Sequence, residues 1–350
     1  MNVRLVCYET AGEWIISKFA SRLNDELRGL GVNSEIGSSP DPRAEVNHHL
    51  LYLGYDGRET SMNTLMVTHI DTVYKMRTLR NQLAHAEMGI CMSRHTMSKL
   101  AAAGFPQHKL CYVHPAHDGM IRPRPLLIGI TCRVYQDGRK REHFLEKLCR
   151  LVDPGDVRFW IMGQGWDAEV AKVRQLGFAV EYHADFDGRL YNASIPALDY
   201  FMYFGMDEGS MGVLDALAAG VKTIVTPVGY QADLSRKLTF TIRNFSDLAA
   251  AVDSIIRERK SSMEAVAGLT WENYARKHLL IWQYVLGGRD RGFLERNRSR
   301  FPDGLAALGD KKSFLPKRWL GKAVFFRSIA GNSLKRRFRK LQEKGSRKCR

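Results

Sequence analysis

One stretch constrains the fold of this 350-residue chain more than any other: residues 207–229, DEGSMGVLDALAAGVKTIVTPVG. Ser210 is a good N-cap, and the residues after it predict a helix with an apolar stripe. Gly220 is suited to ending that helix before a buried strand at residues 223–226. The expected stripe consists of Val213, Leu214, Leu217 and Ala218. A loop, a helix, a tight turn and a strand in this order indicate an α/β unit.

The start of this helix has the features of a ligand site. A helix N-terminus carries partial positive charge and free N–H groups that suit a diphosphate. Asp215 lies about 7 Å further along, at 1.5 Å per residue, and its face also carries Gly212 and Ala219, which are too small to screen it. A carboxylate there can accept hydrogen bonds from ribose hydroxyls. We interpret the segment as a nucleotide-sugar site; the alternative is an ordinary helix–strand unit with two solvated acids.

The acids of this segment resemble the acidic-x7-acidic signature of retaining GT-B-fold glycosyltransferases of the large family-four type. Asp207 and Asp215 have that spacing. The family usually has Glu at both ends and Gly directly after the first, whereas here Glu208 precedes Gly209. The resemblance implies that the first acid contacts the donor sugar or supports the reacting centre, and that the second holds the ribose. Glu208, with Asp207 as its substitute, and Asp215 are the matching residues, and which of the first two acts is left open.

A basic cluster follows the apolar run at residues 126–131 and precedes an amphipathic helix. Departure of a nucleoside diphosphate requires positive charge at the two phosphates, from a divalent metal or from fixed cations. Arg133 and Lys140 can supply it without a metal, and the resembling family has such an Arg and Lys after the first strand of its second domain. Arg139 and Arg141 are then bystanders. A solvated basic loop is the alternative.

A third expected strand ends in the turn Gly163-Gln164-Gly165, which resembles the family's glycine turn beneath the nucleotide. A lone Gly-x-Gly is weak evidence, but the three signals occur in the family's order, each after an expected strand, where open α/β sheets bind ligands. Asp185-Phe186-Asp187 could be the metal-binding Asp-x-Asp of the other large glycosyltransferase fold. Gly188 directly after it indicates a turn, so we interpret it as a loop and expect no metal site.

The first third of the chain opens with an apolar run at residues 3–7, a loop with Gly12 and an amphipathic helix from residue 16 to residue 30. This is the Rossmann opening. Further strands are expected near residues 50–53, 65–69, 88–93 and 110–114. By resemblance, the loops of this domain bind the acceptor, Gly12 approaches the donor, and His69 lies in the cleft. For His69 a histidine satisfied at a strand end is the alternative.

The fold class is therefore α/β, with two Rossmann-like parallel-sheet domains facing across a cleft (GT-B) and a basic C-terminal tail. The polar segment at residues 114–125 has three prolines and is expected to be a hinge, its His114, His117 and Asp118 included. The expected parts are an acceptor domain at 1–117, a nucleotide-sugar donor domain at 118–286 and the tail at 287–350. The helix at 268–286 resembles the closing helix of the GT-B fold.

The tail is strongly basic: residues 311–350 contain 15 Lys and Arg and one acid, Glu343, in a chain of net charge +16. Its apolar residues alternate with cations as in helices that lie in a membrane interface, and each cation near an anionic leaflet contributes about 1 kcal/mol. We therefore expect peripheral attachment of residues 311–350 to an anionic membrane surface on the cytoplasmic face. A solvated tail is the alternative, and nucleic acid is an unlikely partner.

The six cysteines form no close pair, and there is no apolar run of 18 residues or charged-then-apolar N-terminus. These features predict reduced thiols and a cytoplasmic protein. The sequence predicts a glycosyltransferase that moves a sugar from a UDP- or GDP-linked donor, without a cofactor, to a glycan or lipid-linked acceptor, in lipopolysaccharide, other surface polysaccharide or glycolipid biosynthesis. Retention is implied by resemblance only.

Two alternatives remain: a sugar-nucleotide epimerase of the same fold, and a noncatalytic adaptor that binds membrane or nucleic acid. Donor binding would separate both enzymes from the adaptor. The expected donor-binding residues are Gly12, Gly163, Gly165, Gly209, Ser210, Met211, Gly212 and Asp215. The expected catalytic residues are Glu208, Asp207, Arg133, Lys140 and His69.

Overall fold

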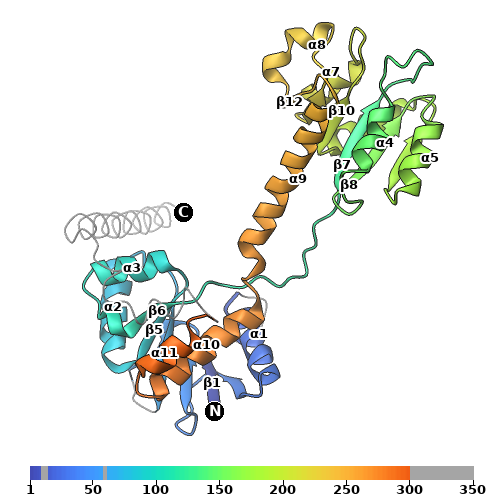
Figure 1. The fold of residues 1–350 in the computed structure, drawn as a ribbon. Coiled ribbons are helices and arrows are strands. Elements are labelled where there is room, and N and C mark those ends of the chain that lie inside the picture. Colours follow the sequence, from blue (N-terminus) through green and yellow to red (C-terminus); the bar gives the residue numbers. More distant parts are fainter. Residues whose placement is uncertain (9–14, 58–60, 300–350) are drawn as a thin grey trace, which may run out of the picture. The chain divides into compact units, whose positions relative to one another are not determined.

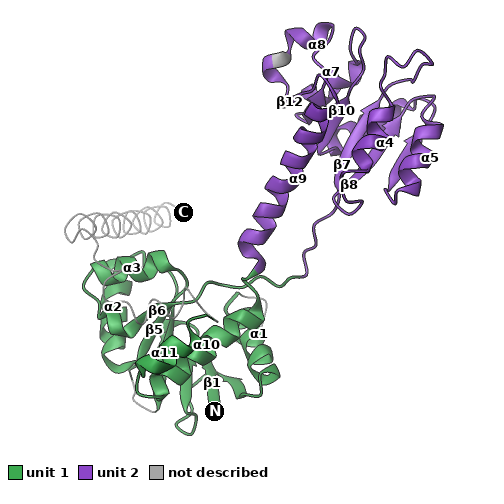
Figure 2. Cartoon of the chain, viewed as in Figure 1, with its two compact units in different colours: residues 1–119, 268–350 green, residues 120–267 purple. Residues whose placement is uncertain are grey.

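The computed structural model describes residues 1–8, 15–57 and 61–299. They form two compact units (Figure 2): unit 1 begins at residue 1, ends at residue 119 and resumes at residue 268, and unit 2 comprises residues 120–267. Each unit contains a six-stranded parallel sheet with helices, which confirms the predicted class of two Rossmann-like domains (Figure 1). Their arrangement across a cleft stays a prediction. Gly12 and the tail at 311–350 lie outside the described residues.

In unit 1 the strand order is β2-β1-β3-β4-β5-β6. The strands are β1 (Asn2–Val6), β2 (Asn33–Gly37), β3 (Val46–His49), β4 (Met62–Val67), β5 (Met88–Cys91) and β6 (Leu110–Tyr112). The helices are α1 (Ile15–Gly29), α2 (Val73–His85), α3 (Arg94–Ala102), α10 (Trp271–Leu286) and α11 (Arg291–Asn297), with short 3-10 turns at Tyr52–Gly54 and Gln107–Lys109. The predicted apolar face of α1, including Phe19 and Leu23, is buried in the core.

The strand predicted near residues 50–53 lies earlier in the chain, at Val46–His49. The prediction missed its position because several of its side chains are polar. His48 and His49 are fully buried, and both find partners on β4. His48 Nδ1 lies 2.9 Å from Thr64 Oγ1, and His49 Nε2 lies 3.0 Å from Asn63 Oδ1. A hydrophobicity pattern cannot detect a strand whose buried groups are paired histidines.

Helix α10 belongs to unit 1, although the predicted division placed residues 268–286 in the second domain. Thr270 caps it by accepting a hydrogen bond from the Asn273 N–H at 3.2 Å. Its aromatic face is buried in the unit 1 core: the Trp271 ring lies 5.2 Å from that of Phe19, and Trp282 Nε1 donates to Thr64 Oγ1 at 3.1 Å. The apolar face was recognised from the sequence, but the sequence did not indicate which core it covers.

The expected hinge is where the chain leaves unit 1 and returns to it. The His117 N–H donates to the Leu269 carbonyl at 2.9 Å, so the outgoing and returning segments run side by side. Asp118 accepts hydrogen bonds from Trp271 Nε1 at 2.8 Å and from Lys18 Nζ at 2.5 Å. These bonds, the one from Lys18 first, hold the pKa of Asp118 below its usual value. Asp118 therefore joins α1 to α10.

In unit 2 the strand order is β12-β11-β10-β7-β8-β9. The strands are β7 (Leu126–Thr131), β8 (Val157–Met162), β9 (Val180–His183), β10 (Tyr200–Tyr203), β11 (Lys222–Val225) and β12 (Phe240–Thr241). The helices are α4 (His143–Cys149), α5 (Asp167–Gln175), α6 (Gly188–Ser194), α7 (Met211–Ala218), α8 (Tyr230–Asp233) and α9 (Phe245–Ala267), with 3-10 turns at Ile195–Ala197 and Ser235–Lys237. None of the described helices in either unit combines the length and apolar character that a membrane span requires.

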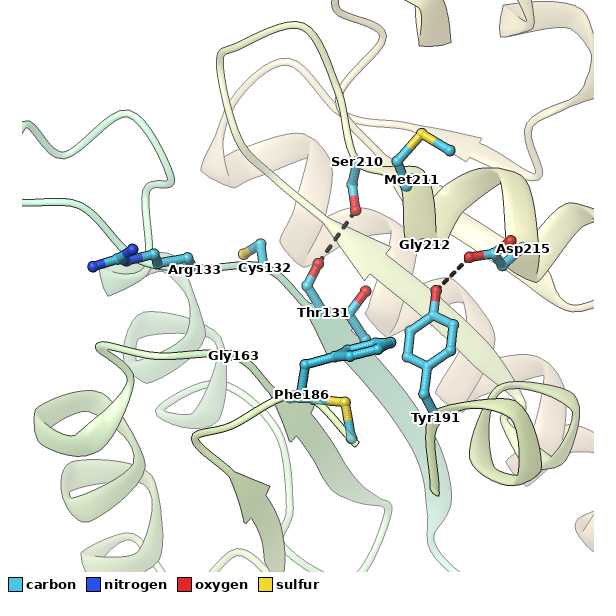
Figure 3. A pocket seen from close by; sticks show the side chains of 11 residues that line it. Thr131, Cys132, Arg133, Gly163, Phe186, Tyr191, Ser210, Met211, Gly212 and Asp215 are labelled. Carbon is cyan, nitrogen blue, oxygen red and sulfur yellow. Dashed lines mark hydrogen bonds between the residues drawn. The ribbon is translucent and has the colours of Figure 1, made fainter. Parts of the chain in front are cut away.

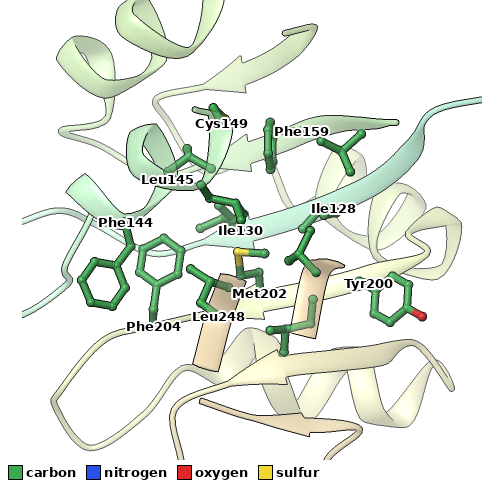
Figure 4. Packing of buried hydrophobic residues seen from close by; sticks show 14 of the residues in the cluster. Ile128, Ile130, Phe144, Leu145, Cys149, Phe159, Tyr200, Met202, Phe204 and Leu248 are labelled. Carbon is green, nitrogen blue, oxygen red and sulfur yellow. The ribbon is translucent and has the colours of Figure 1, made fainter. Parts of the chain in front are cut away.

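The sheet of unit 2 has a core on each face. On one face Ile128 and Ile130 of β7 pack with residues of α4 and α9, including Leu145 and Leu248 (Figure 4). On the other face Phe201 packs with residues of α7 and the turn before β10. The alternation of sides along each strand follows from the period of two.

Helix α7 and strand β11 form where the sequence predicts them, and Gly220, at φ 73°, ends the helix. Its buried residues, however, are Gly212, Val213 and Ala216, whereas Ala218 of the predicted stripe is exposed. Small residues face the sheet because the helix approaches it closely: a Cβ on Gly212 would lie 2.3 Å from Thr131 Oγ1.

The buried histidines of unit 1 give a testable pH dependence. His48 and His278 are fully buried with ring centroids 5.1 Å apart, and the Nε2 atom of each has no hydrogen-bond partner among the described residues. Burial lowers the pKa of His278 to about 4 and that of His48 well below its usual value. The unfolded chain therefore binds protons first as the pH falls below about 6.5.

We predict that unit 1 loses stability as the pH falls from about 6.5 toward 4, by on the order of 3 kcal/mol for His278 alone. Urea unfolding followed by tryptophan fluorescence at pH 7.5, 6 and 5 checks this. His278→Phe, which removes one titrating group, should flatten the dependence. An unchanged pH dependence in that variant would contradict the assignment.

Candidate functional site

The site of unit 2 lies where its chain reverses the direction in which strands are added. From β7 the chain adds β8 and β9 on one side, and from β10 it adds β11 and β12 on the other. β7 and β10 are neighbours, and the crevice at the carboxyl ends of two such strands is where open α/β sheets bind ligands. A pocket of about 370 Å³ lies there (Figure 3).

Six of the predicted residues line this pocket: Arg133, Gly163, Ser210, Met211, Gly212 and Asp215. Five lining residues were not predicted: Thr131, Cys132, Met162, Phe186 and Tyr191. Of the other predicted residues in unit 2, Lys140, Asp207, Glu208, Gly165 and Gly209 are not among the residues that line it.

The glycine turn after β8 forms part of the pocket wall. Gly163 has φ 136°, and a Cβ there would lie 2.2 Å from the Cys132 carbonyl oxygen. Only glycine lets the loops after β7 and β8 touch in this way. Gly165 lies beside Val134, behind that contact. The turn predicted from Gly163-Gln164-Gly165 therefore shapes the site through close backbone packing.

The N-terminus of α7 is open toward the pocket. Ser210 occupies the predicted N-cap position, but its hydroxyl donates to the Thr131 carbonyl at 3.2 Å and does not cap the helix. With its side-chain amide oriented to satisfy both ends, buried Gln231 accepts the Ser210 N–H at 2.7 Å. In the described residues no side chain caps the N–H groups of Met211 and Gly212, which are the free donors of a helix start.

Asp215 lies one turn further along α7 and is exposed. Its Oδ2 atom accepts a hydrogen bond from the Tyr191 hydroxyl at 2.6 Å (Figure 3). The arrangement that the sequence predicted, a helix start followed by a carboxylate on the same side, is therefore present in one pocket.

Lys140 forms a separate network beside the pocket. It is buried, and its ammonium group donates to the Tyr203 hydroxyl at 2.9 Å and to Asp207 Oδ2. Tyr203 in turn donates to Asp207 Oδ1. Gly205 makes room for this arrangement, since a Cβ there would lie 2.3 Å from the tyrosine hydroxyl. Lys140 also acts electrostatically on Cys132, so the network adjoins the pocket wall.

The two candidate first acids have different surroundings. Burial raises the pKa of Asp207, but the hydrogen bonds from Lys140 and Tyr203 and the lysine charge outweigh it and lower that pKa. Asp207 is thus an ionised partner of Lys140. Glu208 is exposed, and no hydrogen bond or ion pair to its carboxylate is present in the described part of the chain. Glu208 is the acid that remains open to a ligand.

The arginines of the basic cluster differ from the expectation in one respect. Arg133 is exposed and lies 5.6 Å from the Tyr135 ring, extending away from Asp215 (Figure 3). Arg141, predicted to be a bystander, binds the carbonyl oxygens of Phe204 and Arg243 at 2.5 and 2.8 Å and Thr226 Oγ1 at 2.5 Å. It therefore ties the loop that carries Lys140 to the ends of three strands.

His69, the predicted catalytic residue of unit 1, lies two residues beyond the end of β4 and is exposed. Its Nε2 atom accepts a hydrogen bond from the Lys75 ammonium group at 2.7 Å, and Lys75 also pairs with Asp71 at 2.8 Å. This is the satisfied histidine of the alternative interpretation. Its function toward an acceptor stays a prediction.

A polar group that the sequence did not indicate lies at the corresponding switch point of unit 1, at the ends of β1 and β3. His49 Nε2–H donates to the Asn63 amide oxygen, which leaves Nδ1 to accept the Tyr8 hydroxyl at 2.7 Å. Burial lowers the pKa of His49, so this ring is neutral at physiological pH.

Both acids of the Asp-x-Asp run have hydrogen-bond partners within unit 2. Asp187 caps α6 by accepting hydrogen bonds from the Arg189 and Leu190 N–H groups at 2.9 and 3.0 Å. Asp185 accepts from Gln164 at 3.3 Å. No group of three or more His, Cys, Asp or Glu residues in the described ranges could hold a metal ion.

No protein-family model and no curated protein matches the chain. Among solved structures it is similar to the lipopolysaccharide outer core galactosyltransferase WaaB, with 12% identity, a TM-score of 0.33 and coverage of 79% of this chain and 97% of that one. The catalytic domain of cholesterol-α-glucosyltransferase from Helicobacter pylori has 21% identity, a TM-score of 0.33 and coverage of 44% and 98%. Anabaena Alr3699/HepE, in complex with UDP and glucose, has 11% identity, a TM-score of 0.32 and coverage of 82% and 99%.

The Lys140–Asp207 pair gives a test of this geometry. Asp207→Asn leaves the buried ammonium group without its counter-charge and should lower the free energy of unfolding of unit 2 by about 2 to 3 kcal/mol. Adding Lys140→Met should recover part of that loss, because the unpaired charge is then gone. Denaturant unfolding of the two single variants and the double variant measures the coupling.

Glu208→Gln is the matched control, and it should change stability by less than about 0.5 kcal/mol because Glu208 is exposed. Strictly additive effects of Asp207→Asn and Lys140→Met would show that the two side chains do not interact in solution.

Proposed function

We propose that the protein is a glycosyltransferase that transfers a sugar from a nucleoside-diphosphate donor, UDP- or GDP-linked, to a glycan or lipid-linked acceptor. One observation carries the proposal: the switch-point pocket of unit 2 combines an uncapped helix start with Asp215, one turn further on. The free N–H groups at Met211 and Gly212 suit a diphosphate. The Asp215 carboxylate lies about 6 Å further along the helix than Met211, where it suits the hydroxyls of the attached ribose.

The size and lining of the pocket support this ligand. Its volume of about 370 Å³ is at the lower end of the range for small-molecule sites. The pocket lining includes Phe186 and Met162, which offer apolar surface to a base or sugar. Cys132 also lines the pocket, and burial raises the pKa of its thiol to about 12, so it is a neutral wall residue and not a nucleophile.

Transfer requires that the bond between the anomeric carbon and the diphosphate oxygen breaks, with its electron pair leaving on the diphosphate. The acceptor hydroxyl oxygen bonds to that carbon and gives its proton to the leaving diphosphate oxygen. In this proposal Arg133, Lys140 and the N–H groups of α7 stabilise the leaving diphosphate without a metal. Asp207 holds Lys140 in place through their ion pair, which leaves Glu208 to contact the sugar near the reacting carbon.

The finer features of the proposal come from the resemblance. Retention of the anomeric configuration follows the acidic-x7-acidic pattern. His69 would lie in the cleft among the residues of the acceptor domain, and Gly12 would approach the donor. A lipid-linked or nascent surface glycan as acceptor would agree with a peripheral position on the cytoplasmic face of a membrane, reached through the basic residues 311–350.

We predict that one class of nucleotide stabilises the purified protein and that Asp215→Ala abolishes this effect. A ligand at 100 times its dissociation constant adds about 2.7 kcal/mol, which raises the melting temperature by several degrees. Thermal unfolding with UDP, GDP and their sugar conjugates is the measurement. Asp253→Ala, which removes an exposed acid on α9, is the matched control and should keep the shift.

No shift with any nucleotide, from protein shown to be folded, would favour the noncatalytic adaptor and contradict the proposal. When a donor is found, incubation without an acceptor distinguishes the epimerase. Conversion of the donor sugar into its epimer would overturn the transferase assignment, whereas a donor consumed only with an acceptor supports it.

The membrane proposal has its own test. The full chain should sediment with vesicles of anionic lipid, and deletion of residues 311–350 should abolish this, because that segment supplies most of the net positive charge. Binding should also fall steeply with salt. Equal binding of the full and shortened chains would refute attachment through this segment.

A further inference from the structure

Tyr191 is the pocket residue that contacts the predicted ribose-binding acid. It lies on α6, and Figure 3 shows its ring extending toward Asp215 on α7. The phenol O–H donates to Asp215 Oδ2 at 2.6 Å. The ring lies beside that of Phe186, with centroids 5.4 Å apart. One hydrogen bond and one ring contact therefore hold the Tyr191 side chain in the pocket.

This hydrogen bond engages one oxygen of the carboxylate and leaves the other available. Among the described residues, Tyr191 is the only one that forms a hydrogen bond with the Asp215 side chain, and Asp215 is exposed. Without Tyr191 the carboxylate would be free to change rotamer. A hydrogen bond of this length to an ionised acceptor is among the stronger ones in proteins. It holds Oδ1 ready to accept further hydrogen bonds.

The tyrosine is suited to act as a permanent donor. Burial and the hydrogen bond to Asp215 raise the pKa of Tyr191 far above physiological pH, so the phenol keeps its proton. Asp215, as a carboxylate, can only accept. A ligand that binds Oδ1 must therefore bring a donor, and the hydroxyl groups of a ribose are such donors.

We propose that Tyr191 is a positioning residue: it fixes Asp215 so that Oδ1 accepts a hydrogen bond from the ribose of a bound nucleoside diphosphate. The pair thereby makes the pocket selective for ribonucleotides over deoxyribonucleotides. This inference rests on the proposed function and adds to it the residue that orients the acid. An acceptor that is already in place costs less to order when the ribose binds. Loss of the tyrosine hydroxyl should therefore weaken the binding of ribonucleotides specifically.

The experiment is calorimetric titration of the full chain with the diphosphate that stabilises it, UDP or GDP, and with its 2′-deoxy and 3′-deoxy forms. The wild type should bind the ribonucleotide more tightly than at least one deoxy form. Tyr191→Phe should lower the affinity for the ribonucleotide about fivefold to tenfold and the affinity for that deoxy form less than twofold. Asp215→Asn should reduce the discrimination further.

Tyr182→Phe is the matched control, because Tyr182 also donates to an aspartate, Asp167, at 3.3 Å but does not line the pocket. It should leave every affinity unchanged. Melting curves of the ligand-free variants show whether each is folded.

Three results would overturn the inference. In the first, Tyr191→Phe keeps the wild-type ratio of ribonucleotide to deoxyribonucleotide affinity, including the case in which both affinities fall together. In the second, Tyr191→Phe binds the ribonucleotide more tightly, which would mean that the tyrosine competes with the ribose. In the third, the wild type binds no nucleotide, which refutes the proposed function and this inference with it; the first two results leave the proposed function intact.

Discussion

The parallel pairing of β7 with β10 is the constraint on which the site depends. It places the carboxyl ends of the two strands side by side at the centre of the unit 2 sheet, with Ile128 opposite Tyr200. The sheet continues to β8 and β9 on one side of this pair and to β11 and β12 on the other, so the loops after β7 and β10 both lie at the same crevice. The loop after β7 carries Arg133 and Lys140, and the segment after β10 carries Asp207 and the start of α7. Gly163, in the turn after β8, allows that turn to meet the loop after β7 backbone to backbone.

Much of the secondary structure and part of the site could be predicted from local pattern. Helices α1 and α7 and strand β11 have patterns or caps that lie within a few neighbouring residues, and six of the predicted site residues share one pocket. Local pattern was insufficient where a residue's partner is distant. Tyr191 meets Asp215, 24 residues away, from a seven-residue helix with no buried residue and no apolar period. Nothing near Tyr191 in the sequence indicates that contact.

The same limit explains the basic cluster and the closing helix. Arg141 and Lys140 are adjacent and chemically alike, yet one anchors a loop to backbone carbonyls and the other pairs with Asp207. Their directions depend on the backbone, which at Arg141 has φ 50°. The sequence of α10 indicates an apolar face but not the core that receives it. In both cases the residue types were identified correctly, and tertiary packing decided their partners.

The return of the chain to unit 1 has a consequence for synthesis. Unit 2 is inserted into unit 1: the chain leaves unit 1 after residue 119 and returns to it at residue 268. His117 and Leu269 are hydrogen bonded where the two segments meet. A ribosome therefore delivers every residue of unit 2 before it delivers α10, whose Trp271, Tyr274 and Trp282 complete the core of unit 1. During synthesis the N-terminal domain usually folds first. Here the core of unit 1 can be completed only after all of unit 2 has been synthesised. The nascent first unit must wait, with part of its core uncovered, for a helix that emerges about 150 residues later.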